Sequence, residues 1–249
     1  MNSKRYFIHF SFDGTAYHGW QRQENALTVQ EVLEQSLSLV CREEIELTGC
    51  GRTDAGVHAA HFYAHFDLEV NWSPTVLQRL PRKLNSILPK DIAVKEIYPV
   101  ANEMHARFSP LSRTYQYRIS RTKDPFLEAF SYYYPLELDV VKMNEGARVL
   151  FEYEDFSCFS RSHTQVKTNL CKIYGAQWES RDDLLIFTIT ADRFLRNMVR
   201  AICGTLIDLG RGRIDLQDLR SIIESKKRSN AGKSMPAKGL FLTAVEYPG

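Results

Sequence analysis

Cysteine is scarce in this chain of 249 residues, and its five cysteines never form a Cys-x-x-Cys pair. They are scattered over the sequence as Cys41, Cys50, Cys158, Cys171 and Cys203. An odd number at irregular spacing argues against a structural zinc site and for a reducing compartment. We therefore expect a cytoplasmic protein.

Long apolar runs are also missing. No stretch approaches the ~18 apolar residues that a membrane span requires. The first six residues, Met-Asn-Ser-Lys-Arg-Tyr, contain no apolar signal-peptide core. The sequence predicts neither a membrane anchor nor a secretory leader.

An excess of one charge is missing too, since 32 lysines and arginines nearly balance 30 aspartates and glutamates, for a net charge of +2. Bulk charge therefore gives no sign of nucleic-acid binding. Such binding would depend instead on local clusters of cations with aromatic residues among them.

Several catalytic motifs have no counterpart in the chain. There is no Gly-x-Ser-x-Gly elbow of a serine hydrolase and no dinucleotide-binding fingerprint. Gly232-Lys233-Ser234 matches a phosphate-binding loop only in part, because Lys227 stands where that motif needs its first glycine. We expect residues 225–238 to form a mobile basic loop, and we expect no nucleotide cofactor.

Three histidines close in sequence, His58, His61 and His65, raise the question of a metal site. On a strand, His61 and His65 share a face whereas His58 does not. No carboxylate or cysteine completes a set with the spacing of metal ligands. We expect these histidines to be structural and expect no bound metal.

Hydrophobic periodicity predicts an α+β fold, with the order strand, helix, two strands, helix, strand in each half of the chain. The expected strands are residues 5–12, 60–68, 92–98, 114–120, 172–179, 184–191 and 240–247, with a further strand end at 45–47. The expected helices are residues 28–40, 73–87, 140–151, 194–209 and 216–224. This order suits two ferredoxin-like halves, residues 1–104 and 105–249, with helices on one face of an antiparallel sheet.

A glycine-rich loop at residues 49–59 is the strongest local feature. Its glycines at positions 49, 51 and 56 surround Arg52 and Asp54. Glycines permit tight turns and close backbone approach, so they suit a loop that carries reactive groups to a ligand. An ordinary exposed turn explains the same residues. With serine, nucleotide and metal motifs missing, Asp54 is the best-placed candidate for a nucleophile or base.

Aromatic and basic residues alternate in a second region. Residues 104–108, Met-His-Ala-Arg-Phe, precede a predicted strand on which Arg113, Tyr115 and Tyr117 share one face. Such a surface can stack bases and hold phosphates. A tyrosine-bearing sheet face under a helix is an equally good explanation.

Two further clusters are basic. At helical spacing Arg193, Arg196 and Arg200 fall on one face, which a solvated basic surface also explains. Arg200 lies deeper in this predicted helix, near Gly204, where an arginine could enter a site and pair with a buried carboxylate. Residues 160–168 form a polar, basic loop that suits contacts to an RNA backbone.

Five blocks of the chain, taken together and in order, resemble the TruA family of tRNA pseudouridine synthases. They are Phe-Asp-Gly-Thr-Ala-Tyr-His-Gly-Trp-Gln-Arg-Gln at 12–23, Gly-Arg-Thr-Asp-Ala-Gly-Val-His-Ala at 51–59, Ala-Arg-Phe at 106–108 with Arg-x-Tyr-x-Tyr at 113–117, Phe-Leu-Arg-Asn-Met-Val-Arg at 194–200, and Gly-Leu at 239–240. The second block is highly specific to the family, and the blocks span nearly the whole chain.

The resemblance implies a fold and an activity. The fold is two ferredoxin-like halves joined through a central antiparallel sheet, and the protein acts as a homodimer. The activity is isomerisation of uridine to pseudouridine at positions 38, 39 and 40 of the tRNA anticodon arm, with base flipping and without cofactor or metal.

The resemblance also implies roles for single residues. Asp54 matches the nucleophilic aspartate, and Arg52 matches the arginine that holds the flipped base out. Tyr115 matches the tyrosine that stacks on the target uracil, and Arg200 matches the basic residue that pairs with the aspartate. RNA contacts are implied for residues 104–108, which include His105, Arg107 and Phe108, and for residues 165–169.

Two other functions fit the same residues less well. A non-catalytic RNA-binding module would have little use for Asp54, because an anion is unfavourable in a phosphate-binding groove. A hydrolytic nuclease would need a carboxylate cluster for two metals or a histidine pair for acid–base catalysis, and the sequence offers neither.

Overall fold

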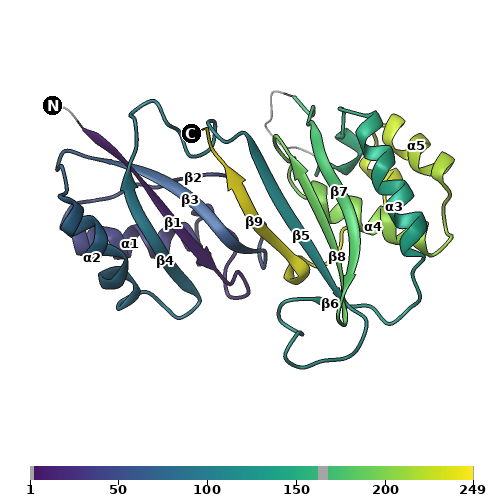
Figure 1. Cartoon of the computed structure of the whole chain (residues 1–249), viewed down its shortest axis with the longest axis horizontal. Helices are drawn as coiled ribbons and strands as arrows, with labels where there is room; N and C mark the ends of the chain where they lie inside the picture. Colours follow the sequence, from purple (N-terminus) through teal and green to yellow (C-terminus); the bar gives the residue numbers. More distant parts are fainter. Residues whose placement is uncertain (1–2, 162–167, 249) are drawn as a thin grey trace. The chain divides into compact units, whose positions relative to one another are not determined.

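The computed structural model describes residues 3–161 and 168–248, which contain nine β-strands and five α-helices (Figure 1). The predicted α+β class is confirmed. The chain forms two compact units, residues 1–111 with 242–249 and residues 112–241. The end of the chain therefore belongs to the first unit, whereas the sequence suggested a single division between residues 104 and 105.

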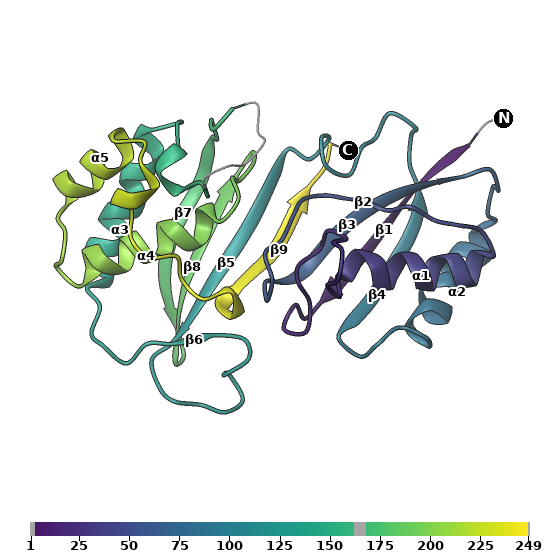
Figure 2. The ribbon, with the colours of Figure 1, turned by 180° about the vertical axis from the view of Figure 1, so that it is seen from behind.

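The first unit alternates strands with two helices. Its elements are β1 (Lys4–Phe12), α1 (Val29–Cys41), β2 (Thr48–Gly49), β3 (His58–Leu68), α2 (Pro74–Asn85), β4 (Ile92–Pro99) and most of β9 (Leu240–Glu246). The strands lie in the order β4-β1-β3-β9, with the short β2 paired to β3. Figure 2 shows α1 running across the strands on one face of this sheet.

Local sequence explains where the helices of the first unit begin. The Thr28 side chain accepts a hydrogen bond from the backbone N–H of Glu31 at the start of α1, and Ser73 caps α2 in the same way. Such caps satisfy backbone N–H groups that have no partner within the helix. Beneath the helices, Phe10 of β1 lies opposite Phe62 of β3, and both rings are fully buried in the core.

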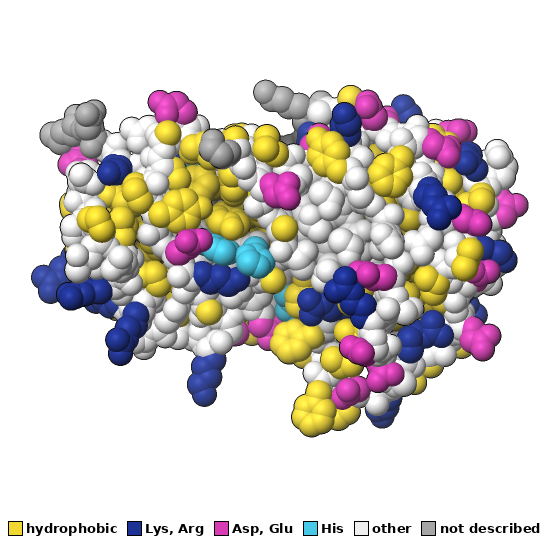
Figure 3. Space-filling view, in the orientation of Figure 1, with side chains coloured by type: hydrophobic (Ala, Val, Ile, Leu, Met, Phe, Trp, Pro, Cys, Tyr) yellow, Lys and Arg dark blue, Asp and Glu magenta, His cyan; other side chains and the backbone are white. Residues whose placement is uncertain are grey.

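The opposite face of the first sheet is covered by its own aromatic side chains. Phe7 is 1% exposed because the rings of Tyr98 and Tyr247 pack against it, with centroids 6.0 and 5.2 Å away. His9 stacks on Tyr63 with ring centroids 4.3 Å apart. Figure 3 shows histidine (cyan) and hydrophobic (yellow) side chains gathered on this face.

The second unit packs three helices against a second set of strands. Its elements are β5 (Ser112–Ser120), β6 (Tyr132–Tyr133), α3 (Val140–Val149), β7 (Ile173–Arg181), β8 (Leu184–Ala191), α4 (Met198–Gly210) and α5 (Leu216–Glu224). The strands β5, β8 and β7 are antiparallel neighbours, and β6 runs parallel to β5. In the core, Trp178 stacks on Phe187 with ring centroids 4.8 Å apart.

Helix α4 starts four residues later than the periodicity predicts, at Met198 instead of residue 194. Asn197 precedes it with a left-handed backbone, φ 68°, which an α-helix cannot continue. Arg193 and Arg196 therefore lie outside the helix, and the predicted basic helix face is wrong. Arg200 is the third residue of α4 and not deep within it.

The segment at residues 225–238 is packed against α4, whereas the sequence suggested a mobile loop. The Gly232 N–H donates to the Thr205 hydroxyl over 2.9 Å, and the Asn197 side chain donates to the Ser234 hydroxyl over 2.6 Å. The guanidinium of Arg228 donates to the Ser234 hydroxyl over 2.7 Å. The first two of these bonds join the segment to α4 and to the residue before it.

Candidate functional site

The glycine-rich stretch at residues 49–59, which we name the Asp54 loop, contains the connection between β2 and β3 and the adjoining ends of both strands. The side chain of Arg52 is exposed and that of Asp54 is half-buried. The Val57 N–H donates to the Asp54 carbonyl over 3.2 Å, so residues 54–57 form a turn, and Gly56 has the positive φ, 77°, that such a turn favours. On the β2 side, the Cys50 N–H donates to a β3 carbonyl over 2.7 Å. Both ends of the loop are therefore tied to strands.

A second loop, residues 13–23, supports the Asp54 loop from one side, and we name it the buttress loop. The Trp20 N–H donates to the Thr53 hydroxyl over 3.0 Å. The Gly56 N–H donates to the Tyr17 carbonyl over 3.2 Å. These two bonds hold the backbone on both sides of Asp54.

Glycines of the buttress loop permit this close contact. A Cβ on Gly19 would lie 2.2 Å from the Thr53 carbonyl oxygen, and a Cβ on Gly14 would lie 2.0 Å from that of Val57. Gly19 also has φ 89°, a conformation that residues with a Cβ rarely adopt. The two loops fit together because these positions carry no side chain.

Buried polar side chains fix the buttress loop to the rest of the first unit. The Tyr17 hydroxyl donates to the Asp91 carboxylate over 2.6 Å, and burial together with this bond raises the pKa of Tyr17. The buried Nδ1 of His58 lies 2.9 Å from the Asp13 carboxylate and 3.1 Å from the Gly14 nitrogen. The His58 ring thereby connects the start of the buttress loop to β3.

The predicted RNA-contacting segment at residues 104–108 also lies in the first unit. Its backbone is anchored at Ala106, whose N–H donates to Nδ1 of His65 over 3.1 Å and whose carbonyl accepts from the Tyr247 hydroxyl over 2.7 Å. Phe108 is 74% exposed, and the Arg107 guanidinium lies 5.4 Å from the centre of its ring. This segment presents an aromatic ring and a cation to solvent.

Burial shapes the acid–base behaviour of two histidines beside this segment. It lowers the pKa of His65 to about 4, with further contributions from Arg5 and His105. The pKa of His105 is also lowered, mainly by burial and then by Arg5 and Arg107. At neutral pH His65 is therefore uncharged, as an acceptor of the Ala106 N–H must be.

Tyr115 of β5 lies in the second unit and is 9% exposed. Its ring meets that of Phe194 edge to face, with centroids 5.1 Å apart. Its neighbours on the strand make contacts within the second unit: Tyr117 is fully buried with its hydroxyl on the Pro236 carbonyl, and Arg113 donates to the Asp192 carbonyl. The buried position of Tyr117 is what the alternative, a tyrosine-bearing sheet face under a helix, predicts at that residue.

Arg200 of α4 is also in the second unit, and a specific contact holds its side chain. Its Nε donates to the Met235 carbonyl over 2.6 Å, while the Met235 N–H donates to the Arg200 carbonyl over 3.1 Å. These two hydrogen bonds restrict the conformation of the Arg200 side chain relative to its own backbone. They also explain part of the packing of residues 225–238 on α4.

Part of the third predicted contact region lies outside the described residues. This holds for residues 165–167 of the implied RNA-contacting stretch and for 162–164 of the basic loop before it. Asn169, which ends the stretch, donates its side-chain amide to the Ser157 hydroxyl over 2.8 Å. The described end of this stretch therefore makes an internal contact.

Two findings concern membranes and metals. Within residues 3–161 and 168–248, no helix is long and apolar enough to cross a bilayer.

Over the same part of the chain, no group of three or more His, Cys, Asp or Glu side chains could hold a metal ion. His61 instead lies 2.9 Å from His9, nitrogen to nitrogen.

The supporting role of the buttress loop is the main feature that the sequence did not reveal. Its glycines at 14 and 19 and its buried Tyr17 and Trp20 were visible as a loop rich in glycine and aromatics. The signal that could have indicated the role is the pairing of two glycine-rich loops, since one permits close approach by the other. Only the tertiary structure shows that the buttress loop is the one that packs against the Asp54 loop.

The sequence of this chain is similar to those of known proteins. The sequence model of the family described as tRNA pseudouridine synthase matches residues 8–109 and 153–248. The tRNA pseudouridine synthase A of Bacteroides fragilis is 49% identical over 249 residues, which cover 100% of this chain and 98% of that protein. The protein of that name from Parabacteroides distasonis is 50% identical over 98% of this chain and 96% of its own. The protein of that name from Caldicellulosiruptor bescii is 37% identical over 95% of this chain and 96% of its own length.

Proposed function

Because the chain belongs to the tRNA pseudouridine synthase family, isomerases that act on tRNA, we propose that it converts uridine to pseudouridine at positions 38, 39 and 40 of the anticodon arm. The observation that carries the proposal is the Asp54 loop. It presents a carboxylate beside an exposed arginine, and backbone hydrogen bonds hold it on both sides. Preorganisation of this kind is what a catalytic group requires.

The reaction explains why a carboxylate is needed. The N1–C1′ bond of uridine breaks, a C5–C1′ bond forms, C5 loses its proton and N1 gains one. Asp54 either attacks C1′ of the ribose, which displaces N1 of the uracil, or adds to C6 of the uracil. The bond to Asp54 holds one part of the nucleotide while the ring turns, and it breaks again once the C5–C1′ bond forms, which releases the carboxylate. Asp54 is half-buried, so part of the residue is in contact with solvent, which supports this role.

Arg52 has a different role in this proposal. A stacked uridine is out of reach, so the enzyme must extrude it at a cost of a few kcal/mol and keep it out of the stack. The Arg52 side chain is exposed and two residues from Asp54, which supports a role in holding the target base flipped out.

Tyr115 and Arg200 of the second unit complete the proposed catalytic set. Tyr115 stacks on the target uracil, and its ring is already oriented by Phe194. Arg200 is proposed as the basic residue that acts with the catalytic aspartate. The bond from Arg200 Nε to the Met235 carbonyl supports this role because it restricts the side chain.

Residues 104–108 are proposed to contact the RNA. Phe108 is exposed and stands beside Arg107, and an aromatic ring next to a guanidinium suits stacking on an unpaired base. His105 packs against the same ring with centroids 4.5 Å apart. These three side chains form one surface feature with the chemistry of a single-strand contact.

The remaining proposals concern architecture and context. We propose that the units are ferredoxin-like, supported in the first by the order β1-α1-β2-β3-α2-β4 and by the strand order β4-β1-β3. We also propose a homodimer that acts in the cytoplasm without cofactor or metal. Sedimentation of the purified protein tests the dimer directly.

Tritium release tests the activity. The protein is incubated with tRNA tritiated at uridine C5, without added metal, and release is followed together with the integrity of the RNA. We expect release from intact tRNA. Binding without release would indicate a non-catalytic RNA-binding module, and strand breaks would indicate a nuclease.

Substitution of Asp54 tests the assignment of the nucleophile. We expect Asp54→Asn and Asp54→Ala to abolish release while tRNA affinity stays within about tenfold. Glu44→Gln is a matched control, because Glu44 is an exposed carboxylate a few residues before the same loop. Turnover that persists in Asp54→Asn would remove Asp54 from the mechanism.

A further inference from the structure

The three residues before β2 belong to no strand of the sheet. We name residues 45–47 the approach segment, because they lead through β2 into the Asp54 loop. Ile45 and Leu47 are buried, so their peptide groups need hydrogen-bond partners other than water. A neighbouring strand would normally supply them.

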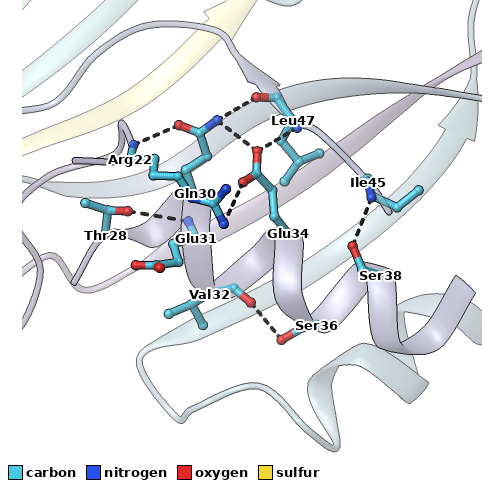
Figure 4. Close-up of polar contacts among 10 residues, drawn as sticks. All are labelled: Arg22, Thr28, Gln30, Glu31, Val32, Glu34, Ser36, Ser38, Ile45 and Leu47. Carbon is cyan, nitrogen blue, oxygen red and sulfur yellow. Dashed lines mark hydrogen bonds and ion pairs between the residues drawn. The ribbon is translucent and has the colours of Figure 1, made fainter. Parts of the chain in front are cut away.

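Side chains of α1 supply these partners instead (Figure 4). The Leu47 N–H donates to the Glu34 carboxylate over 2.9 Å. The Leu47 carbonyl accepts from the side-chain amide of Gln30 over 3.0 Å. The Ile45 N–H donates to the Ser38 hydroxyl over 2.9 Å. Both peptide groups of Leu47 are therefore satisfied by one helix.

The spacing of these three residues makes the arrangement possible. Gln30, Glu34 and Ser38 are four residues apart and so lie in one row along α1. Gln30 also donates to Glu34 over 2.9 Å, which links the first two members of the row. The row acts as a polar ladder that replaces a strand neighbour, and we name it the α1 ladder.

The α1 ladder also reaches the buttress loop. The Arg22 N–H donates to the side-chain oxygen of Gln30 over 2.9 Å, and the Arg22 guanidinium lies 3.6 Å from the second carboxylate oxygen of Glu34. Glu34 is 6% exposed. A buried carboxylate with three donors around it holds the groups that surround it in fixed positions.

We propose that the α1 ladder positions the Asp54 loop for catalysis, with Glu34 and Gln30 as its principal positioning residues. The ladder holds the approach segment on one side of the loop and the buttress loop, through Arg22, on the other. Its two attachments fix the path of the chain into β2 and the placement of the Trp20–Thr53 contact. The inference rests on the proposed role of Asp54, because a catalytic effect requires the nucleophile to lie in this loop.

Matched substitutions at Glu34 test the ladder. Glu34→Leu keeps the size of the side chain and removes both acceptor oxygens, whereas Glu34→Gln keeps one acceptor for the Leu47 N–H. We expect Glu34→Leu to lower kcat for tritium release about tenfold or more while KM for tRNA stays within about threefold, because a small misplacement of a catalytic group lowers the rate more than it weakens binding. We expect Glu34→Gln to stay within about threefold of the wild type in kcat.

Amide hydrogen exchange gives a readout that does not depend on activity. In Glu34→Leu we expect faster exchange at Leu47 and through residues 48–54, with exchange in α5 of the second unit unchanged. Should Glu34→Leu fail to fold, Ser38→Ala and Gln30→Leu remove single members of the ladder, and the same two readouts are expected to move in the same direction. Ser36→Ala is the control, because the Ser36 hydroxyl donates to the Val32 carbonyl within α1 and not, among the described residues, to the approach segment.

The outcomes separate this inference from the proposed function. Wild-type kcat with unchanged exchange at residues 45–54 in the ladder variants would overturn the inference. Persistent turnover in Asp54→Asn would overturn the role of Asp54, and faster loop exchange in Glu34→Leu would then still establish the ladder as the support of the loop. If kcat fell no further in Glu34→Leu than in Ser36→Ala, that result would also count against the proposed role of the ladder.

Discussion

The backbone N–H of Trp20 donates a 3.0 Å hydrogen bond to the hydroxyl of Thr53, the residue before Asp54. Through this bond a loop residue 33 positions earlier in the chain helps to set the position of the proposed nucleophile. The Trp20 side chain is itself buried, against Phe10 and Phe62, so the donor is fixed by the core.

Thr53→Val should therefore lower both stability and turnover. The substitution keeps the shape of the side chain but leaves the Trp20 N–H without its acceptor, which costs about 1–3 kcal/mol when the group is buried. Thr53→Ser keeps the hydroxyl and is expected to stay within about 1 kcal/mol of the wild type. Urea unfolding and tritium release measure the two effects, and equal behaviour of the two variants would contradict the role of the bond.

Gly19→Ala should be strongly destabilising, whereas Gly51→Ala should not. A Cβ at Gly19 would meet the Thr53 carbonyl oxygen at 2.2 Å, and its φ of 89° is unfavourable for alanine. A Cβ at Gly51 would meet nothing within 4 Å. We expect a Tm loss of several degrees only for Gly19→Ala, measured by thermal unfolding monitored by circular dichroism. A similar loss in both variants would mean that close contact between the loops is not what requires Gly19.

Acid should weaken the first unit in part through His65. Its pKa is about 4, against 6.5 in the unfolded chain, mainly because of burial, with Arg5 and His105 acting in the same direction and Asp67 opposing them. Since the folded state resists protonation, the unfolded state binds more protons below pH 6.5. The contribution of neutral His65 to the free energy of unfolding is therefore fully present above pH 6.5 and is lost as the pH falls from 6.5 towards 4.

His65→Asn isolates this effect. An asparagine oxygen can replace Nδ1 as the acceptor of the Ala106 N–H, but it does not titrate. We expect the free energy of unfolding to fall less between pH 7 and pH 5 in His65→Asn than in the wild type, measured by urea unfolding at each pH. Parallel curves for the two proteins would show that His65 does not contribute to the pH dependence.

Arg200→Lys should reduce turnover although the charge is kept. Lysine has a single nitrogen at the end of a flexible chain, so it cannot reproduce a planar guanidinium that is held through Nε at the Met235 carbonyl. We expect kcat for tritium release to fall about tenfold or more, with the protein still folded. Arg148→Lys is the control, because Arg148 is an exposed arginine in the last turn of α3. An unchanged rate in Arg200→Lys would place Arg200 outside the reaction.

Elements with strong local signals could be predicted from the sequence. The boundaries of β8 and α5 agree with the structure to the residue, and α1 begins at the predicted cap, Thr28. Helix α4 could not be placed in this way. Its apolar period continues upstream of residue 198, and only the left-handed backbone of Asn197 shows where the helix starts.

The sequence by itself determined the α+β class, the Gly-Arg-Thr-Asp-Ala-Gly-Val-His block and the family, because these depend on local periodicity and on a specific order of residue types. Tertiary structure alone decided how the Asp54 loop is held. Trp20 bonds to Thr53, and Glu34 bonds to Leu47, across separations of 33 and 13 residues. Such contacts form only after the sheet brings distant segments together. The sequence contains many polar groups that could bond to a given buried group, and the folded chain places only a few of them within hydrogen-bond distance.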